Sequence, residues 1–149
     1  MMKKIIIATD GSDMSKNAIK TGIDIAHHAK GCIAAVYVID ISRLSHLPGY
    51  AMLPGLKEKI SQLMREEGEQ ATQYAEDLAQ KMSVPCQKIV VQGNPSLEIL
   101  KSAREIEADL IVIGSMGRTG FEKILLGSVA EKVVLQSSIP VLMIKEDGN

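Results

Sequence analysis

Short apolar runs alternate with longer amphipathic stretches along the chain, and this alternation constrains the fold most. The runs are rich in Val and Ile and are continuous rather than strictly alternating, which is typical of strands buried on both faces. They occupy residues 4–8, 33–39, 88–91, 110–113 and 141–144. Four helices are predicted between them, at about 13–30, 55–82, 94–107 and 128–136. The order βαβαβαβαβ predicts an α/β fold with a five-stranded parallel sheet and helices on both faces, because crossovers are right-handed.

Capping residues mark the start of three of these helices. Ser12 is placed to cap the first, and Asn94 followed by Pro95 is typical of a cap and a first helical residue. Ser128 with Glu131 three residues later matches a capping box, so the fourth helix is expected to be capped by Ser128. The second helix has an apolar stripe, expected to face the core, made of Leu56, Ile60, Leu63, Met64, Ala71, Tyr74, Ala75, Leu78 and Met82.

Length and composition indicate one domain, residues 1–149, with a core of its own. A chain of 149 residues has the usual size of one domain. Aromatic residues make up 3%, and 17 basic against 18 acidic residues give a net charge of −1. Few aromatic side chains could stack on bases and no strongly basic face is implied, so nucleic-acid binding is disfavoured.

No targeting or membrane segment is predicted, so we expect a cytoplasmic protein. The longest apolar run, 33–39, is far shorter than the roughly 20 residues that a membrane span needs. Asp10 ends the first apolar stretch too early for a signal peptide. Cys32 and Cys86 form no CxxC pair, so we interpret them as buried free thiols.

The loops that follow the strands are the candidate site, because ligands of such sheets bind at the carboxyl ends of the strands. These loops are 9–12, 40–53, 92–95 and 114–128. The last contains four glycines within fourteen residues, Gly114, Gly117, Gly120 and Gly127, and it leads into a helix. Glycine lets backbone N–H groups approach a ligand, and a helix N-terminus adds unpaired N–H groups. Such a loop favours an anion, most often phosphate.

The glycine spacing and four separated segments resemble the universal stress protein family. Gly114-x-x-Gly117, nine residues, then Gly127-Ser128 matches that family's phosphate motif. The segments IIIATDGSDMS, GSMGRTG and LLGSVAEKVV are close to its usual wording, and residues 138–142 (SIPVL) resemble its last strand. The resemblance covers the whole chain. It implies a Rossmann-like sheet with strand order 3-2-1-4-5 and membership of the ATP-binding subclass, with or without Mg²⁺.

The resemblance also implies a set of ligand-binding residues, obtained by carrying the family's site positions over to the matching positions of this chain. Ala8, Thr9 and Asp10 would flank adenine and ribose, and the backbone of Val38 would meet the adenine edge. Ribose and phosphates would be held by Gly114, Gly117, Arg118, Gly127, Ser128 and Val129.

Other nucleotide-binding and phosphate-binding classes fit the chain less well. The third strand ends without the Asp that a phosphoacceptor receiver needs, and there is no G-x-x-x-x-G-K-[ST] loop. The turn after the first strand lacks the dinucleotide glycine fingerprint. Asp10 could contact a ligand or simply hold its turn through nearby N–H groups. No second carboxylate is clearly placed beside it, so a built-in metal site is not expected.

Three functions remain open at this stage. The favoured one is a nucleotide-dependent regulatory or signalling protein of the stress response, because no pair of nucleophile and base can be recognised. A slow or partner-activated ATP hydrolase and a nucleotide-free dimeric interaction module are the alternatives. Residues 141–144 form an apolar strand that the implied order leaves at a sheet edge, so we expect a homodimer through this strand.

Overall fold

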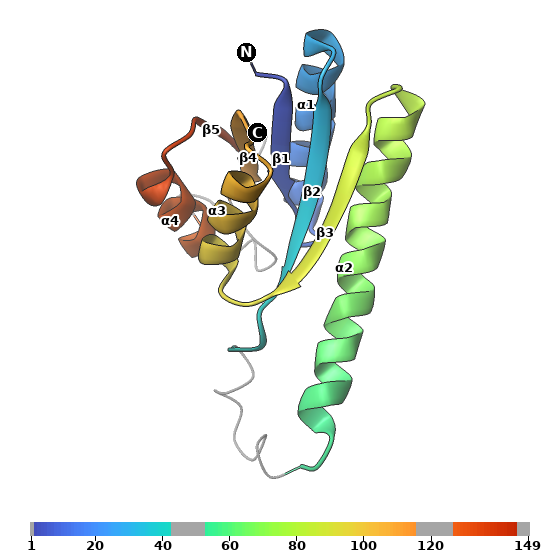
Figure 1. Cartoon of the computed structure of the whole chain (residues 1–149). Coiled ribbons are helices and arrows are strands. Elements are labelled where there is room, and N and C mark those ends of the chain that lie inside the picture. The colour runs from blue at the N-terminus through green and yellow to red at the C-terminus, as the bar shows by residue number, and fades with distance from the viewer. Residues whose placement is uncertain (1, 43–52, 116–126, 146–149) are drawn as a thin grey trace.

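The computed structural model describes residues 2–42, 53–115 and 127–145. Strands and helices alternate without exception along these residues (Figure 1). The strands are β1 (Lys4–Ala8), β2 (Cys32–Ile39), β3 (Cys86–Gln92), β4 (Leu110–Gly114) and β5 (Val141–Ile144). The helices are α1 (Asp13–Ala29), α2 (Leu56–Lys81), α3 (Pro95–Glu105) and α4 (Ser128–Gln136).

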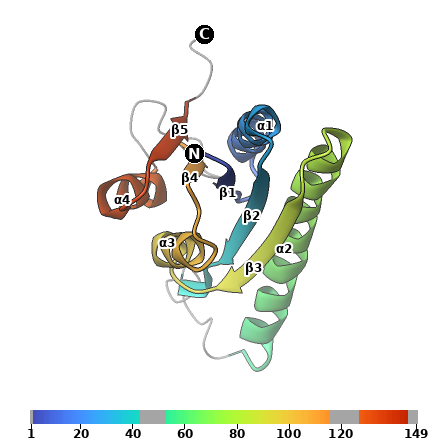
Figure 2. The same cartoon turned by 45° about the horizontal axis from the view of Figure 1, so that its top comes forward.

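The five strands form one parallel sheet in the order β3-β2-β1-β4-β5, which confirms the predicted fold class and order. Helices cover both faces of this sheet (Figure 2). Successive side chains of a strand point to opposite faces, and β1 shows how both faces become core. Ile5 and Ile7 belong to the cluster that includes α1 and α2, whereas Ile6 belongs to the cluster that includes α3 and α4.

The element boundaries differ from the predicted ones at several ends. β3 is longer than the predicted range 88–91, because its outer residues Cys86 and Gln92 pair with β2. α3 ends before 107, and Glu107 has a left-handed φ of 57°, which does not continue a helix.

Two of the three predicted caps are confirmed and one is wrong. The Ser12 and Asn94 side chains accept hydrogen bonds from Ser15 N and Leu97 N. Ser128, however, is the first helical residue of α4, and Gly127 occupies the cap position. The backbone of Ser128 is already helical, so its side chain does not cap the helix.

The predicted apolar stripe of α2 is only partly buried. The buried residues of this helix are Gly68, Ala71, Thr72, Ala75 and Ala79, all in its later turns. Leu63 is 55% exposed, although periodicity predicts a core position. Figure 1 shows why: the first turns of α2 extend past the sheet, where no strand lies beneath them. Within the described residues, no helix combines the length and the apolar composition that crossing a membrane requires.

Candidate functional site

The turn between β1 and α1 has a conformation set by short polar side chains and one glycine. Gly11 has a φ of +83°, which residues with a Cβ rarely adopt. The Asp10 carboxylate accepts a hydrogen bond from Ser12 N at 3.0 Å, and Thr9 Oγ1 accepts one from Gly11 N at 3.2 Å. The turn is therefore fixed by its own side chains at the carboxyl end of the central strand.

The start of α4 lies at the same edge of the sheet. Gly127 N donates to the carbonyl of Ser115, which joins the start of the helix to the residue after β4. Within the described part of the chain, no side chain caps α4. Its first intrahelical bond is donated by Glu131 N to Gly127 O at 2.9 Å. The first-turn N–H groups of a helix have no intrahelical acceptor, so they are available to a ligand.

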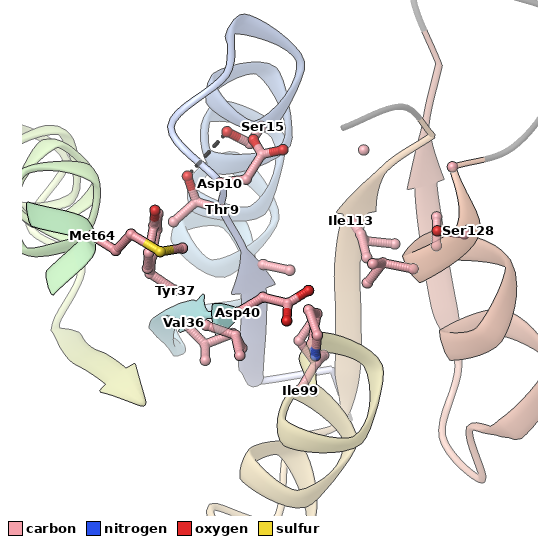
Figure 3. A pocket seen from close by; sticks show the side chains of 17 residues that line it. Thr9, Asp10, Ser15, Val36, Tyr37, Asp40, Met64, Ile99, Ile113 and Ser128 are labelled. Carbon is pink, nitrogen blue, oxygen red and sulfur yellow. Dashed lines mark hydrogen bonds between the residues drawn. The ribbon is translucent and has the colours of Figure 1, made fainter. Parts of the chain in front are cut away.

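A cavity of about 200 Å³ lies between these two segments (Figure 3). Thr9 and Asp10 stand on one side of it and Ser128 on the other. Its lining comes from the carboxyl ends of β1, β2 and β4 with the residues that follow them, from the starts of α1, α3 and α4, and from one turn of α2. The lining residues are Ala8, Thr9, Asp10, Ser15, Val36, Tyr37, Val38, Asp40, Met64, Pro95, Ile99, Ile113, Gly114, Gly127, Ser128, Val129 and Ala130.

The structure brings together every described residue of the predicted site. Eight of the ten line the cavity: Ala8, Thr9, Asp10, Val38, Gly114, Gly127, Ser128 and Val129. The other two, Gly117 and Arg118, lie outside the described residues. The positions of the eight agree with a shared site, and their contact with a ligand stays a prediction.

The apolar walls of the cavity contain residues that the sequence did not single out. Val36 and Ile113 come from strands, and Ile99 and Met64 come from helices. Their sequence patterns are those of ordinary core residues, so no signal separates them from the core. Pro95 and Asp40 fall within the candidate loops 92–95 and 40–53, although neither was named as a ligand-binding residue; the structure places Pro95 at the first position of α3. An apolar slot with polar ends is the usual form of a small-molecule site.

Gly114 has a packing role in addition to its place in the cavity wall. A Cβ at this position would lie 2.7 Å from Met14 Cγ of α1. Gly114 does not have a positive φ, so a glycine is needed here for space and not for an unusual backbone conformation. Because Gly114 has no side chain, Met14 of α1 packs closely against the end of β4, where Gly114 lines the cavity.

Two carboxylates line the cavity, those of Asp10 and Asp40. The Asp40 carboxylate accepts hydrogen bonds from the backbone N and the hydroxyl of Ser42. The expectation that no second carboxylate would accompany Asp10 is therefore incomplete, because Asp40 shares its cavity. Among the described residues there is no group of three or more His, Cys, Asp or Glu side chains that could hold a metal ion.

The two cysteines take no part in this site. Both are free and half-buried within the described structure, somewhat more accessible than predicted. Cys86 begins β3, at the opposite end of the strand from the cavity. Burial, with a smaller effect of the nearby Glu76 carboxylate, raises the pKa of the Cys86 thiol to about 11. A thiol is nucleophilic only as its thiolate, so Cys86 is a poor nucleophile near neutral pH.

Comparison with known families and proteins gives a consistent result. The family model described as the universal stress protein family matches residues 1–145. The chain is 42% identical over 146 residues to the universal stress protein MJ0531 of Methanocaldococcus jannaschii, which covers 98% of this chain and 84% of that protein. The solved structure of the hypothetical protein MJ0577 has a TM-score of 0.86 at 28% identity, and the match covers 100% of this chain and 99% of that one.

More distant solved structures share the fold and hold nucleotides. A universal stress protein in complex with cAMP has a TM-score of 0.67 at 24% identity and covers 97% of both chains. A family member from Arabidopsis thaliana with AMP bound has a TM-score of 0.69 at 17% identity, covering 98% of this chain and 93% of that one. At these identities the likeness is one of fold.

Proposed function

The chain belongs to the universal stress protein family, and on this premise we propose that it binds an adenine nucleotide, ATP in the first place, and acts as a nucleotide-dependent regulatory protein of the stress response. Relatives of the same fold hold cAMP and AMP. The glycine motif that resembles the ATP-binding subclass supports a triphosphate. Expected partners are thus the nucleotide and the proteins that distinguish the occupied from the empty state.

One observation carries this proposal: the start of α4, which no described side chain caps, faces the Thr9–Asp10 turn across an apolar cavity. The N–H groups of Ser128 and Val129, with the positive end of the helix dipole, suit phosphate oxygens. The apolar walls, Ile99 among them, suit the faces of a purine. Thr9 and Asp10 offer oxygens to the sugar. A nucleotide is a ligand that needs all three environments.

Magnesium would enter with the nucleotide rather than occupy a site of its own. Mg²⁺ is usually bound through one or two carboxylates together with substrate phosphates. Asp10 or Asp40 could supply such a carboxylate, directly or through water. Calorimetric titration with ATP in the presence and absence of Mg²⁺ measures this contribution.

The direct test is thermal unfolding with MgATP on protein shown to be nucleotide-free. A ligand at 100 times its Kd adds about 2.7 kcal/mol of stability. For a chain of this length we expect the Tm to rise by roughly 5–10 °C. Guanosine triphosphate at the same concentration is the control for general anion effects. A Tm that millimolar MgATP leaves unchanged would refute the proposal.

Slow hydrolysis of ATP is compatible with the same site and is measured separately. Phosphate release by pure protein, compared with the Gly127→Val variant from the same purification, separates turnover from contamination. Equal rates in the two proteins would assign the phosphate release to a contaminant.

We further propose a domain organisation, a cellular location and an oligomeric state for the protein. The whole chain, 1–149, is one domain, the protein is cytoplasmic, and two copies associate through β5. The single sheet with a core cluster on each face supports the first point. The position of β5 at the edge of the sheet supports the third.

A further inference from the structure

Two buried hydroxyl groups lie side by side at the end of β1. Thr9 is 6% exposed and Ser15, in the first turn of α1, is 5% exposed. Thr9 Oγ1 and Ser15 Oγ are 3.0 Å apart, and both residues line the cavity (Figure 3). Neither the resemblance nor the glycine motif singles out Ser15, which makes its place here unexpected.

Counting protons gives the direction of the bond between these hydroxyls. Ser15 Oγ is 2.8 Å from the carbonyl oxygen of Ser12, which can only accept, so the Ser15 proton is committed to that bond. A hydroxyl has one proton and two accepting positions. The proton between the two hydroxyls therefore belongs to Thr9, and Thr9 donates to Ser15.

Thr9 Oγ1 consequently has an accepting position left for a ligand and no proton to donate. Its one proton is held by Ser15, and one accepting position of Oγ1 is taken by Gly11 N at 3.2 Å. The remaining accepting position suits a ligand group that donates a hydrogen bond. A phosphate oxygen also only accepts, so it would be repelled by the lone pairs of Thr9 Oγ1 and would form no hydrogen bond with it.

We infer that Ser15 is a positioning residue that makes Thr9 select a hydrogen-bond donor, a sugar hydroxyl, at this end of the cavity. The inference rests on the proposed nucleotide binding and deepens it. The two ends of the cavity then have opposite polarity. Oxygen acceptors of Thr9 and Asp10 lie on one side, and the N–H donors of the α4 start lie on the other. This polarity fits the ligand orientation that the family resemblance implies, with the sugar toward β1 and the phosphate toward α4.

The test compares groups of different polarity at the same sugar position. Affinities are measured for ATP, for its 2′-deoxy and 3′-deoxy analogues, and for the matching 2′-fluoro and 3′-fluoro analogues. Hydroxyl donates and accepts, hydrogen does neither, and fluorine only accepts. In the parent protein we expect hydroxyl to bind about 5-fold more tightly than hydrogen at the position facing Thr9, the ratio that one neutral hydrogen bond gives. Fluorine should bind no better than hydrogen there.

Ser15→Ala is the decisive variant, because it releases the Thr9 proton. Thr9 can then donate to the ligand. In this variant the fluoro analogue should bind more tightly than the deoxy analogue, whereas in the parent protein it binds no more tightly. Ser12→Ala is the matched control. It removes the side chain that caps α1 but keeps the Ser12 carbonyl that accepts from Ser15. This control loses helix stability without changing the direction of the hydroxyl bond, so it should keep the parent's order of affinities.

Each other outcome overturns the inference. A parent protein with no preference for hydroxyl over hydrogen at either position shows that Thr9 does not select a donor. A Ser15→Ala variant with the parent's order shows that Ser15 does not set the polarity of Thr9. A Ser12→Ala variant that also changes the order assigns the effect to α1 stability. If no adenine nucleotide binds at all, the proposed function fails, and the inference fails with it.

Discussion

At the scale of single residues, a glycine such as Gly127 can be needed for an unusual backbone conformation or for the space that a side chain would fill. Its φ of −60° and ψ of 145° are extended values that any residue can adopt. Gly127 is therefore not required by a backbone conformation that only glycine adopts. What remains is space, because Gly127 lines the cavity where the α4 backbone is expected to meet phosphate.

Gly127→Val should weaken ATP binding while the fold is retained. A branched side chain at the cavity wall would displace phosphate from the N–H groups of α4. Loss of one charge-assisted hydrogen bond lowers affinity by about 10- to 100-fold. Calorimetric titration measures the affinity, and circular dichroism checks the fold. Gly127→Ala should lose less, in proportion to its smaller side chain. Parent-like affinity of the Val variant would contradict a phosphate position beside Gly127.

Residue chemistry also decides which parts of the site could be predicted. Asp10 and Gly127 could be named because both follow strands at the edge of the sheet where ligands bind and both match the family motif, although Asp10 also holds its own turn. Ile99 and Met64 line the same cavity, but an apolar residue on an amphipathic helix has the same sequence signature whether it faces the core or a ligand. The polar ends of the cavity were predictable for this reason, and its apolar walls were not.

At the scale of elements, α2 meets the site through a close contact between Gly68 and Tyr37. A Cβ at Gly68 would lie 2.6 Å from Cδ1 of the Tyr37 ring. The Tyr37 hydroxyl donates to the Glu67 carboxylate at 2.8 Å. Tyr37 also lines the cavity, so the position of α2 along the sheet sets the position of a cavity wall.

Gly68→Ala should destabilise the protein although alanine favours helices. The gain in helix propensity is about 1 kcal/mol, whereas forcing a methyl group against a buried ring costs about 1–3 kcal/mol. We expect a net loss of roughly 1 kcal/mol in the free energy of unfolding, measured by urea denaturation. Glu69→Ala, on the exposed side of the same turn, is the control and should stay within about 0.5 kcal/mol of the parent. A Gly68→Ala variant as stable as the parent would show that α2 is free to shift.

A second contact between elements joins the starts of β1 and β4. The Asp109 carboxylate accepts from Lys4 N at 2.9 Å and from Lys3 N at 3.1 Å. The Lys4 bond chiefly, and the Lys3 bond after it, hold the pKa of Asp109 below its ordinary value of 3.8. A carboxyl whose pKa is lowered by folding stabilises the fold above its unfolded pKa, and this stabilisation disappears as the pH falls through the folded pKa.

Asp109→Asn should therefore destabilise the protein near pH 7 and much less in acid. The charge is absent from the variant at every pH, whereas the parent loses it only below about pH 4. The difference in stability between parent and variant should be constant from about pH 5 upward and should shrink below about pH 4. Urea denaturation at a series of pH values measures it. A difference that does not change with pH would assign the effect to geometry rather than to charge.

The elements themselves were mostly predictable, and the exceptions have physical causes. Continuous apolar runs predicted all five strands because a parallel sheet buries both faces. The predicted cap of α4 was wrong. Ser128 and Glu131 match the capping pattern in sequence, but Gly127 is the residue with the extended backbone angles of a cap. The exposure of Leu63 was missed because periodicity shows a helix face but not how far the sheet beneath it extends. The strand order came from family resemblance, since alternation alone allows several orders.

At the scale of the whole molecule, the sheet has two edge strands, β3 and the short apolar strand β5. β5 pairs only with β4 among the described residues, and its far side has no strand partner there. Leu142 at the centre of β5 is 36% exposed, and Val134 and Leu135 of α4 are 41% and 74% exposed. An apolar edge invites pairing with another chain. Pairing about a two-fold axis would cover both edges at once, because such a contact is self-complementary.

Sedimentation velocity at tens of micromolar should accordingly show a dimer, since a complex with a Kd of about 1 μM would be mostly formed in that range. Leu142→Lys should give a monomer, because it places a charge in the centre of the apolar edge. Leu63→Lys is the matched control: Leu63 is also an exposed leucine, but it lies on α2, which packs against β2 and β3 rather than at the β5 end of the sheet. This variant should remain a dimer. A parent protein that is monomeric in this range, or a Leu63→Lys variant that dissociates as Leu142→Lys does, would rule out association through β5.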